Sequence, residues 1–133
     1  MAQITTGTLL AGKYRLESLI GRGGMGSVWR AEHLGLSAPV AVKLLDLVDF
    51  TGNAEALNRF HREAHAAASI RSPHVVQILD HGVDEALAAP FIVMELMEGE
   101  SLANRLTRVG RISAAEAARV FTHVARALGR AHE

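Results

Sequence analysis

A cluster of glycines is the first group of residues in this chain that could do chemistry: Gly21-Arg22-Gly23-Gly24-Met25-Gly26. Because Gly21, Gly23 and Gly26 carry no Cβ atom, main-chain N–H groups can approach phosphate oxygens closely there, and the turn can adopt positive φ. A glycine-rich hairpin without a ligand accounts for a lone match of this kind equally well, since glycines are common in turns. The cluster therefore indicates a phosphate site only if other residues support it.

Two charged residues within apolar patterns are the second group. Lys43 is the only ionisable residue in residues 40–45. Glu63 shares a predicted helical stripe with apolar residues at steps of three or four: Ala56, Phe60, Ala67 and Ile70. A lysine and a carboxylate buried without partners are each costly, so we expect both to face the interior and to form an ion pair of about 4 Å or less. The alternative is that Lys43 extends to solvent and Glu63 lies at the margin of the stripe.

The residues around these candidates predict an antiparallel sheet. Alternating apolar residues and short β-branched or aromatic runs indicate five strands, at residues 14–20, 27–31, 40–45, 75–79 and 90–96. A polar turn around residues 82–85 is expected to separate the last two strands. The glycine cluster then forms the turn between the first and second strands, and Lys43 lies on the third.

Helical patterns follow in two places. A helix is expected between Asn53, its N-cap, and Pro73, its end, and this helix carries Glu63. A short helix over about residues 102–109 should end at Gly110, and the capping box of residues 113–116 should open a longer one. The apolar stripe of that last helix consists of Val120, Phe121, Val124, Leu128 and Ala131.

Composition excludes several classes of protein. A length of 133 residues with 49% hydrophobic and 21% charged residues predicts one folded domain or part of one. Fourteen Lys+Arg against fourteen Asp+Glu leave no basic excess, so no nucleic-acid partner is expected. Without cysteine there is no disulfide or zinc–thiolate site, and no metal ligands stand out. With no leader sequence and no apolar run long enough to span a bilayer, we expect a cytoplasmic location and no membrane segment.

The glycine cluster, Lys43 and Glu63 occur in an order that resembles the amino-terminal lobe of a protein kinase. The residues at 21–33 and 59–64 are similar to those of the bacterial serine/threonine kinases of eukaryotic (Hanks) type, and the resemblance covers about residues 13–133. It implies an α+β fold. Residues 13–98 would form the N-lobe with its hinge, a five-stranded antiparallel sheet plus one long helix, after an N-terminal extension at 1–12. Residues 99–133 would form the first two helices of the C-lobe.

The resemblance also implies ATP and Mg²⁺ as cofactors and assigns the site. Lys43 and Glu63 would be the catalytic residues: Glu63 would hold the lysine in place, and Lys43 would bind the α- and β-phosphates. Val28 and Ala41 would sandwich the adenine, with Met94 as the gatekeeper. The full implied set of nucleotide-binding residues is Ile20, Gly21, Gly23, Gly24, Gly26, Val28, Ala41, Lys43, Met94, Glu95, Met97 and Ser101. Among these, the Glu95 carbonyl and the Met97 N–H would bond the adenine edge, and Ser101 would lie near the ribose.

Two kinase motifs do not occur in the sequence. The catalytic loop H-R-D-L-x-x-x-N and the D-F-G motif, which supply the base and the Mg²⁺ ligands, are both absent. We therefore expect the ATP-binding, front half of a kinase that phosphorylates protein Ser/Thr hydroxyls, and we expect the isolated chain to be inactive. Specificity for serine and threonine over tyrosine rests on the resemblance alone. The uncovered apolar stripe of the last helix is expected to be mobile or to drive self-association.

The sequence is open to three other interpretations. The serious one is a non-catalytic nucleotide-binding or interaction module with the same fold. A dinucleotide site could use Asp46 as its ribose-binding acid, but that fingerprint needs a helix at Gly26, where a strand is predicted. A zinc hydrolase could use His61 and His65, one helical turn apart, but the glutamate of H-E-x-x-H is missing directly after His61.

Overall fold

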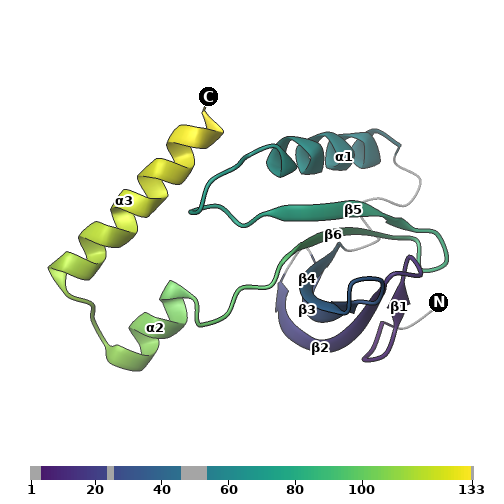
Figure 1. Ribbon diagram of the computed structural model, residues 1–133, viewed down its shortest axis with the longest axis horizontal. Helices are drawn as coiled ribbons and strands as arrows, with labels where there is room; N and C mark the ends of the chain where they lie inside the picture. Colours follow the sequence, from purple (N-terminus) through teal and green to yellow (C-terminus); the bar gives the residue numbers. More distant parts are fainter. Residues whose placement is uncertain (1–3, 24–25, 46–53, 133) are drawn as a thin grey trace. The chain divides into compact units, whose positions relative to one another are not determined.

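The computed structural model describes residues 4–23, 26–45 and 54–132 of the chain (Figure 1). Contacts divide the chain into two compact units. The first, here called the sheet unit, comprises Met1–Ser69 and Gln77–Leu96. The second, here called the helical unit, comprises Ile70–Val76 and Met97–Glu133. Gly24, Asn53 and Asp46, which the sequence singled out, lie outside the described residues.

The sheet unit contains a six-stranded antiparallel sheet in the order β1-β2-β3-β4-β6-β5. The strands are β1 (Leu9–Leu10), β2 (Tyr14–Gly23), β3 (Gly26–His33), β4 (Ala38–Leu45), β5 (Ile78–Asp84) and β6 (Ala89–Glu95). All five expected strands form. The sixth, β1, comes from residues expected to be an extension, and it pairs Leu10 with Tyr14. It joins the sheet because the Leu10 side chain is fully buried in the core.

One face of the sheet forms the hydrophobic core, and we call it the core face. Alternate residues of neighbouring strands meet there because cross-strand partners project to the same side. Its buried residues are Leu10, Tyr14, Leu16, Trp29, Ala31, Val40, Val42, Leu44, Ala89, Phe91 and Val93. Val42 and Val93, which are direct partners in the β4–β6 register, are both fully buried. Strands β4 and β6 are therefore held in register by their packed side chains.

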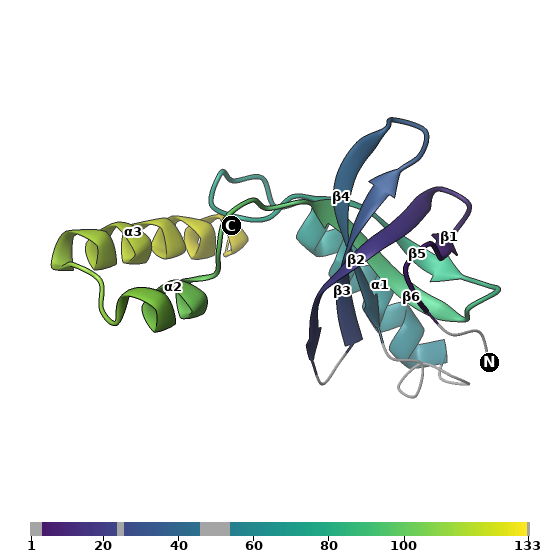
Figure 2. The same ribbon diagram turned by 90° about the horizontal axis from the view of Figure 1, so that it is seen from below.

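The sheet curls around this core (Figure 2), and hydrogen bonds join strands from opposite ends of the strand order. The Tyr14 hydroxyl of β2 donates to Asp80 Oδ2 of β5 at 2.6 Å. The Ala11 N–H donates to Asp84 Oδ2 at 2.7 Å, and Asp84 Oδ1 accepts from the Leu87 N–H at 2.8 Å. Asp84 is only 7% exposed, and its carboxylate therefore satisfies two backbone donors that would otherwise be costly to bury.

The turn expected around residues 82–85 lies further along the chain than predicted. Strand β5 runs to Asp84, and the turn occupies residues 85–88, where the Ala88 N–H donates to the Glu85 carbonyl at 3.3 Å. Ala88 adopts a positive φ of 48°. The polar residues 82–85 resembled a turn in sequence, but the buried Asp84 carboxylate belongs to the core face and caps the turn that follows. The strand expected at 75–79 accordingly begins only at Ile78.

Helix α1 spans Ala54–Ala68 and packs beside β5 (Figure 1). Its described buried residues are Phe60 and Ala64, one turn apart. The Phe60 ring meets the His81 ring edge-on, with centroids 6.3 Å apart, and the His61 and His81 rings lie 5.6 Å apart. The helix therefore covers the face of the sheet opposite to the core face, since His81 pairs with Ile92 and not with a core residue.

The helical unit contains α2 (Leu102–Val109) and α3 (Ala114–Ala131), as expected. The Ser113 hydroxyl caps α3 by accepting from the Glu116 N–H at 3.1 Å, and Gly110 ends α2 with φ of 85°. Arg105 joins the helices through a 2.6 Å bond to Glu116. Its partner carboxylate raises the pKa of Arg105, and an ion pair with Arg108 lowers the pKa of Glu100.

Large apolar side chains of the helical unit are exposed. Neither α2 nor α3, whose residues are all described, has a buried residue, and Phe121 is 74% exposed. Val124 and Leu128 lie on the same stripe and are about half exposed. Of the helices in the described ranges, none combines the length and the apolar character needed to cross a membrane.

Gly26→Ala should destabilise the sheet unit far more than Gly23→Ala does. Gly26 has φ of 150°, and a Cβ atom there would clash with the backbone of Leu44 on β4, whereas a Cβ atom on Gly23 meets nothing within 4 Å. We expect the first change to lower the free energy of unfolding by about 1–3 kcal/mol and the second by less than about 0.5 kcal/mol. Urea denaturation followed by circular dichroism measures both. Equal losses would show that the β3–β4 contact is not as close as described.

The stability of the fold should fall as the pH rises past the ordinary pKa of tyrosine. Burial, reinforced by the bond to Asp80, raises the pKa of Tyr14 far above its ordinary value of 10.0. Above that pH an unfolded chain loses the tyrosine proton while the folded chain keeps it, so the folded state loses relative stability. Urea midpoints should therefore fall between about pH 9 and about pH 11 in the parent chain and fall less in Tyr14→Phe.

Absorbance provides an independent check, because Tyr14 is the only tyrosine in the chain. Tyrosinate absorption in the near ultraviolet should appear together with unfolding and not before it. A tyrosinate signal near the ordinary pKa in a chain that is still folded would contradict the hydrogen bond to Asp80.

Candidate nucleotide site

The glycine hairpin joins β2 to β3. Its described register pairs Gly21 with Val28 and Gly23 with Gly26, and the pairing is irregular between Leu19 and Gly21. Gly26 requires glycine because of its positive φ and its close approach to the backbone of Leu44. Among the described residues, nothing lies within 4 Å of a Cβ atom built on Gly21 or on Gly23. Their surroundings therefore leave room for a ligand to approach the main chain.

Lys43 lies on the face of the sheet opposite to the core face, which we call the site face. In the β3–β4 register it is paired with Val28, and in the β4–β6 register it is paired with Ile92. Ala41, two residues earlier on β4, is paired with Met94. Because paired and alternate residues project to one side, these five side chains share the site face. Lys43 is half-buried there, an ammonium group in an apolar row.

Glu63 does not meet Lys43 in this structure. Among the described residues the ion pairs of 4.0 Å or less do not include these two side chains, and Glu63 is exposed. The expectation that both charges face the interior is wrong for Glu63. The buried side of α1 is centred on Phe60 and Ala64, with Leu57 and His61 half-buried beside them. Because successive residues of a helix are about 100° apart, Glu63 lies just outside the arc that these four residues form.

The remaining expected site residues are distributed over both units. Ile20 is 55% exposed on β2. Glu95, at the end of β6, accepts from the Gln77 N–H at 3.0 Å through its side chain. Met97 and Ser101 belong to the helical unit. Met97 is 64% exposed, and the Ser101 hydroxyl accepts from the Asn104 N–H at 3.1 Å, which makes Ser101 the N-cap of α2.

Sequence reasoning missed one residue that lines this site and one that stabilises the fold on the core face. Ile92 lies opposite Lys43 and lines the site face, but in sequence it was only one residue of an apolar strand. The Asp84 carboxylate binds the N-terminal segment at Ala11 and the β5–β6 turn at Leu87, whereas the sequence predicts only a polar turn there. A signal for Ile92 would have required the strand register, which sequence periodicity does not give.

Known proteins are similar to this chain in sequence and in fold. The family model described as "Protein kinase domain" matches residues 14–133. The serine/threonine-protein kinase PknA of Mycobacterium tuberculosis is 38% identical over 129 residues, which are 95% of this chain and 30% of PknA. PrkC of Bacillus subtilis, also a serine/threonine-protein kinase, is 35% identical over 127 residues, 96% of this chain and 19% of PrkC.

Solved structures of kinase domains are also similar to this chain. A crystal structure of the Mycobacterium tuberculosis PknI kinase domain matches with a TM-score of 0.81 and 27% sequence identity. That match covers 98% of this chain and 53% of the PknI chain, so this chain spans about half of that domain and less than a third of the curated relatives. The expected α+β fold, with a kinase N-lobe followed by helices of the C-lobe, is confirmed. By its sequence and its fold, this chain belongs to the protein kinase domain family, among the bacterial serine/threonine kinases of Hanks type.

Proposed function

We propose that the chain is the ATP-binding part of a serine/threonine protein kinase, which transfers the γ-phosphate of ATP to Ser/Thr hydroxyls of a protein substrate. The observation that supports this most directly is the position of Lys43 on the site face, between Val28 and Ile92 in register and next to the glycine hairpin. The N-lobe boundaries of residues 13–98, the C-lobe start at 99 and a cytoplasmic location belong to the same proposal.

Each residue of the site face would have a separate role. The apolar side chains of Val28, Ala41 and Met94 suit the two faces and the edge of an adenine ring. The Lys43 ammonium would bind the α- and β-phosphates, and its apolar neighbours would strengthen this interaction by excluding water. Main-chain N–H groups of the glycine hairpin would add bonds to the phosphate oxygens. Glu95 and Met97 would bond the adenine edge through their backbones, and Ser101 would lie near the ribose.

Glu63 enters this proposal as a partner that must move. In kinases the helix glutamate holds the lysine in the active arrangement. Here Glu63 is exposed and unpaired with Lys43, so pairing would require α1 to rotate about its own axis or to shift along β5. The contact that such a movement would change is the packing of Phe60 and His61 on His81.

Mg²⁺ accompanies ATP throughout the family and would neutralise charge on the phosphates. The family's ligands for this ion belong to the H-R-D-L-x-x-x-N and D-F-G motifs, which this sequence does not contain. The residues present therefore fit ATP and not the metal, and the roles proposed for them concern ATP alone.

Lys43→Met should weaken ATP binding by about tenfold or more while leaving adenosine binding unchanged. The lysine would contact the phosphates, and a hydrogen bond to a charged group of this kind typically accounts for one to two orders of magnitude in affinity. Lys13→Met is the matched control, because Lys13 and Lys43 are the two lysines of the chain and Lys13 lies on the turn before β2. Isothermal titration calorimetry with ATP and with adenosine measures both ligands.

Ala41→Leu separates the adenine part of the site from the phosphate part. A larger side chain on the site face should reduce the affinity for adenosine and for ATP alike.

Equal ATP affinity in the parent chain and in Lys43→Met would refute the proposed role of Lys43. Binding without transfer is expected of the isolated chain. Steady transfer of labelled phosphate to a generic protein, lost in Lys43→Met, would show that the expected inactivity is wrong.

Self-association through α3 is also proposed, with a second copy of this chain as the partner. Phe121 is 74% exposed on a stripe with Val124 and Leu128, and a net charge of zero gives no repulsion between copies. Phe121→Asp should shift sedimentation-velocity profiles toward the monomer, whereas Thr122→Asp, one residue away on the exposed surface, should not. A parent chain that sediments as a monomer at every concentration would contradict the proposal.

A further inference from the structure

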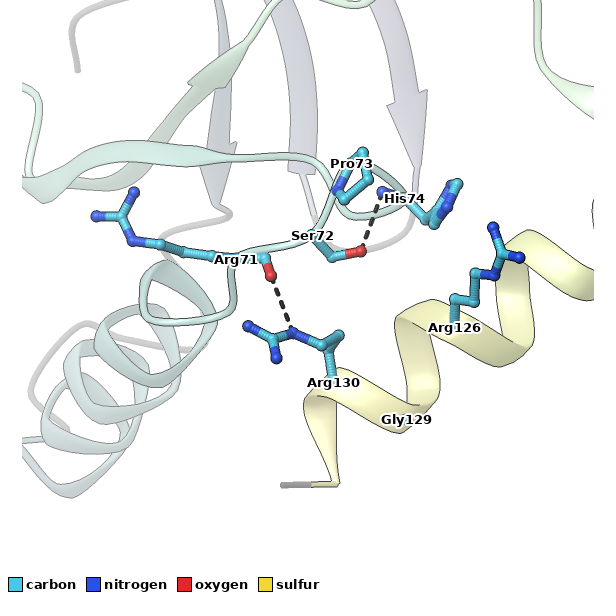
Figure 3. Close-up of a pocket in the computed structure, with 7 residues that line it drawn as sticks. All are labelled: Arg71, Ser72, Pro73, His74, Arg126, Gly129 and Arg130. Atoms are coloured by element: carbon cyan, nitrogen blue, oxygen red, sulfur yellow. Dashed lines mark hydrogen bonds between the residues drawn. The ribbon is translucent and has the colours of Figure 1, made fainter.

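A pocket of about 550 Å³ lies within the helical unit, between residues 70–76 and the last turns of α3 (Figure 3). Its lining consists of Arg71, Ser72, Pro73, His74, Arg126, Gly129 and Arg130. Three of these seven residues are arginines, and none of these described lining residues carries a carboxylate. The pocket is therefore positively charged and open to solvent.

The walls of the pocket are held together by specific contacts. The Arg130 Nε–H donates to the Arg71 carbonyl at 3.1 Å, and the His74 N–H donates to the Ser72 hydroxyl at 3.1 Å. The rings of His74 and His123 stack with centroids 4.2 Å apart and planes 18° apart. These contacts attach the loop of residues 70–76 to α3 at two points, so the pocket has a defined shape.

Gly129 leaves the floor of the pocket open. A Cβ atom built there would meet nothing within 4 Å. Glycine stabilises a helix less than alanine does, and the described surroundings of Gly129 would accept an alanine, so packing does not explain the glycine at this position. Gly129 therefore lines the pocket without a side chain, together with Arg126 and Arg130, which lie on the same face of α3, one turn apart.

Positive charge accumulates around this space. Arg126 and Arg130 repel one another at this spacing, and His123 adds a third basic group three residues before Arg126. Figure 3 shows the Arg126 guanidinium extending toward the His74 ring. Burial, and then the proximity of His123 and Arg126, lowers the pKa of His74.

We propose that this pocket binds a phosphate group, with Arg126 and Arg130 as the main cationic ligands and the Ser72 hydroxyl as a further donor. A planar guanidinium matches two oxygens of a phosphate, and two of them can neutralise a dianion. The pocket lies near the C-terminus of α3, whose dipole contributes about half a negative charge. Two full positive charges exceed this opposing field, so an anion is still favoured.

The phosphate group could be carried by a phosphorylated serine side chain or be free inorganic phosphate, and both present the same dianion. The pocket is separate from the site face and shares no residue with it. This inference therefore does not depend on the proposed function. If the ATP site fails its test, phosphate binding here is unaffected, because the amides followed in this pocket belong to residues outside that site.

The test is a titration of the full chain with a phosphoserine peptide, with the same peptide unphosphorylated, and with inorganic phosphate, followed by backbone amide chemical shifts. Phosphate-bearing probes should shift the amides of Ser72 and Gly129, and the unphosphorylated peptide should not. Arg126→Gln should weaken binding by about tenfold. Arg111→Gln removes the same charge from the exposed loop between α2 and α3 and should change nothing.

Two further variants keep the test decisive if a charge substitution disturbs the fold. Gly129→Leu leaves every charge and hydrogen bond in place but fills the pocket, and it should abolish the shifts. Arg126→Gln likewise leaves the bond between Arg130 and Arg71 intact. Equal binding of both peptides, or binding that survives both Gly129→Leu and Arg126→Gln, would overturn the proposal. Tighter binding of the phosphopeptide than of inorganic phosphate identifies a protein source, and equal binding identifies free phosphate.

Discussion

The closure of the curled sheet around its core face is the constraint on which the rest of the sheet unit depends. Tyr14 on β2 and Asp80 on β5 are far apart in the strand order, yet their side chains meet at 2.6 Å, and Asp84 binds the backbone at Ala11 and Leu87. These bonds are possible only when the large apolar residues of the core strands all point inward. A shift of one residue in any strand would move its buried set outward, so closure fixes the register throughout.

That register decides where the candidate nucleotide site lies. With Val42 and Leu44 committed to the core face, the two-residue period of β4 leaves Ala41 and Lys43 on the site face. Burying a lysine ammonium in the core would be very costly, whereas the site face keeps it half-buried within reach of solvent and ligand. The same packing that stabilises the fold therefore leaves Lys43 on the site face, where we propose that it binds an anionic partner.

The helical unit is stabilised by different means. No described residue of α2 or α3 is buried, and the unit relies on helix caps at Ser101 and Ser113 and on the ion pairs around Arg105. Exposed ion pairs of this kind contribute little individually. Its apolar stripe and its arginine-lined pocket are the surfaces for which we propose binding, of a second copy of the chain and of a phosphate group respectively.

The sequence by itself determined the secondary structure and the family. Local signals, such as the alternation along β2 and the cap at Ser113, act over a few residues. They predicted the existence of five strands and both C-terminal helices, but they misplaced the start of β5 and the turn after it. The glycine cluster, Lys43 and Glu63 identified a kinase from their order alone. The tertiary structure decided what depends on distant partners: the sixth strand at Leu9–Leu10, the burial of Asp84 and the outward orientation of Glu63. Helical periodicity places residues around an axis, but only packing against β5 sets which arc of α1 is buried, because the rotation of a helix is chosen by its neighbour and not by its own sequence.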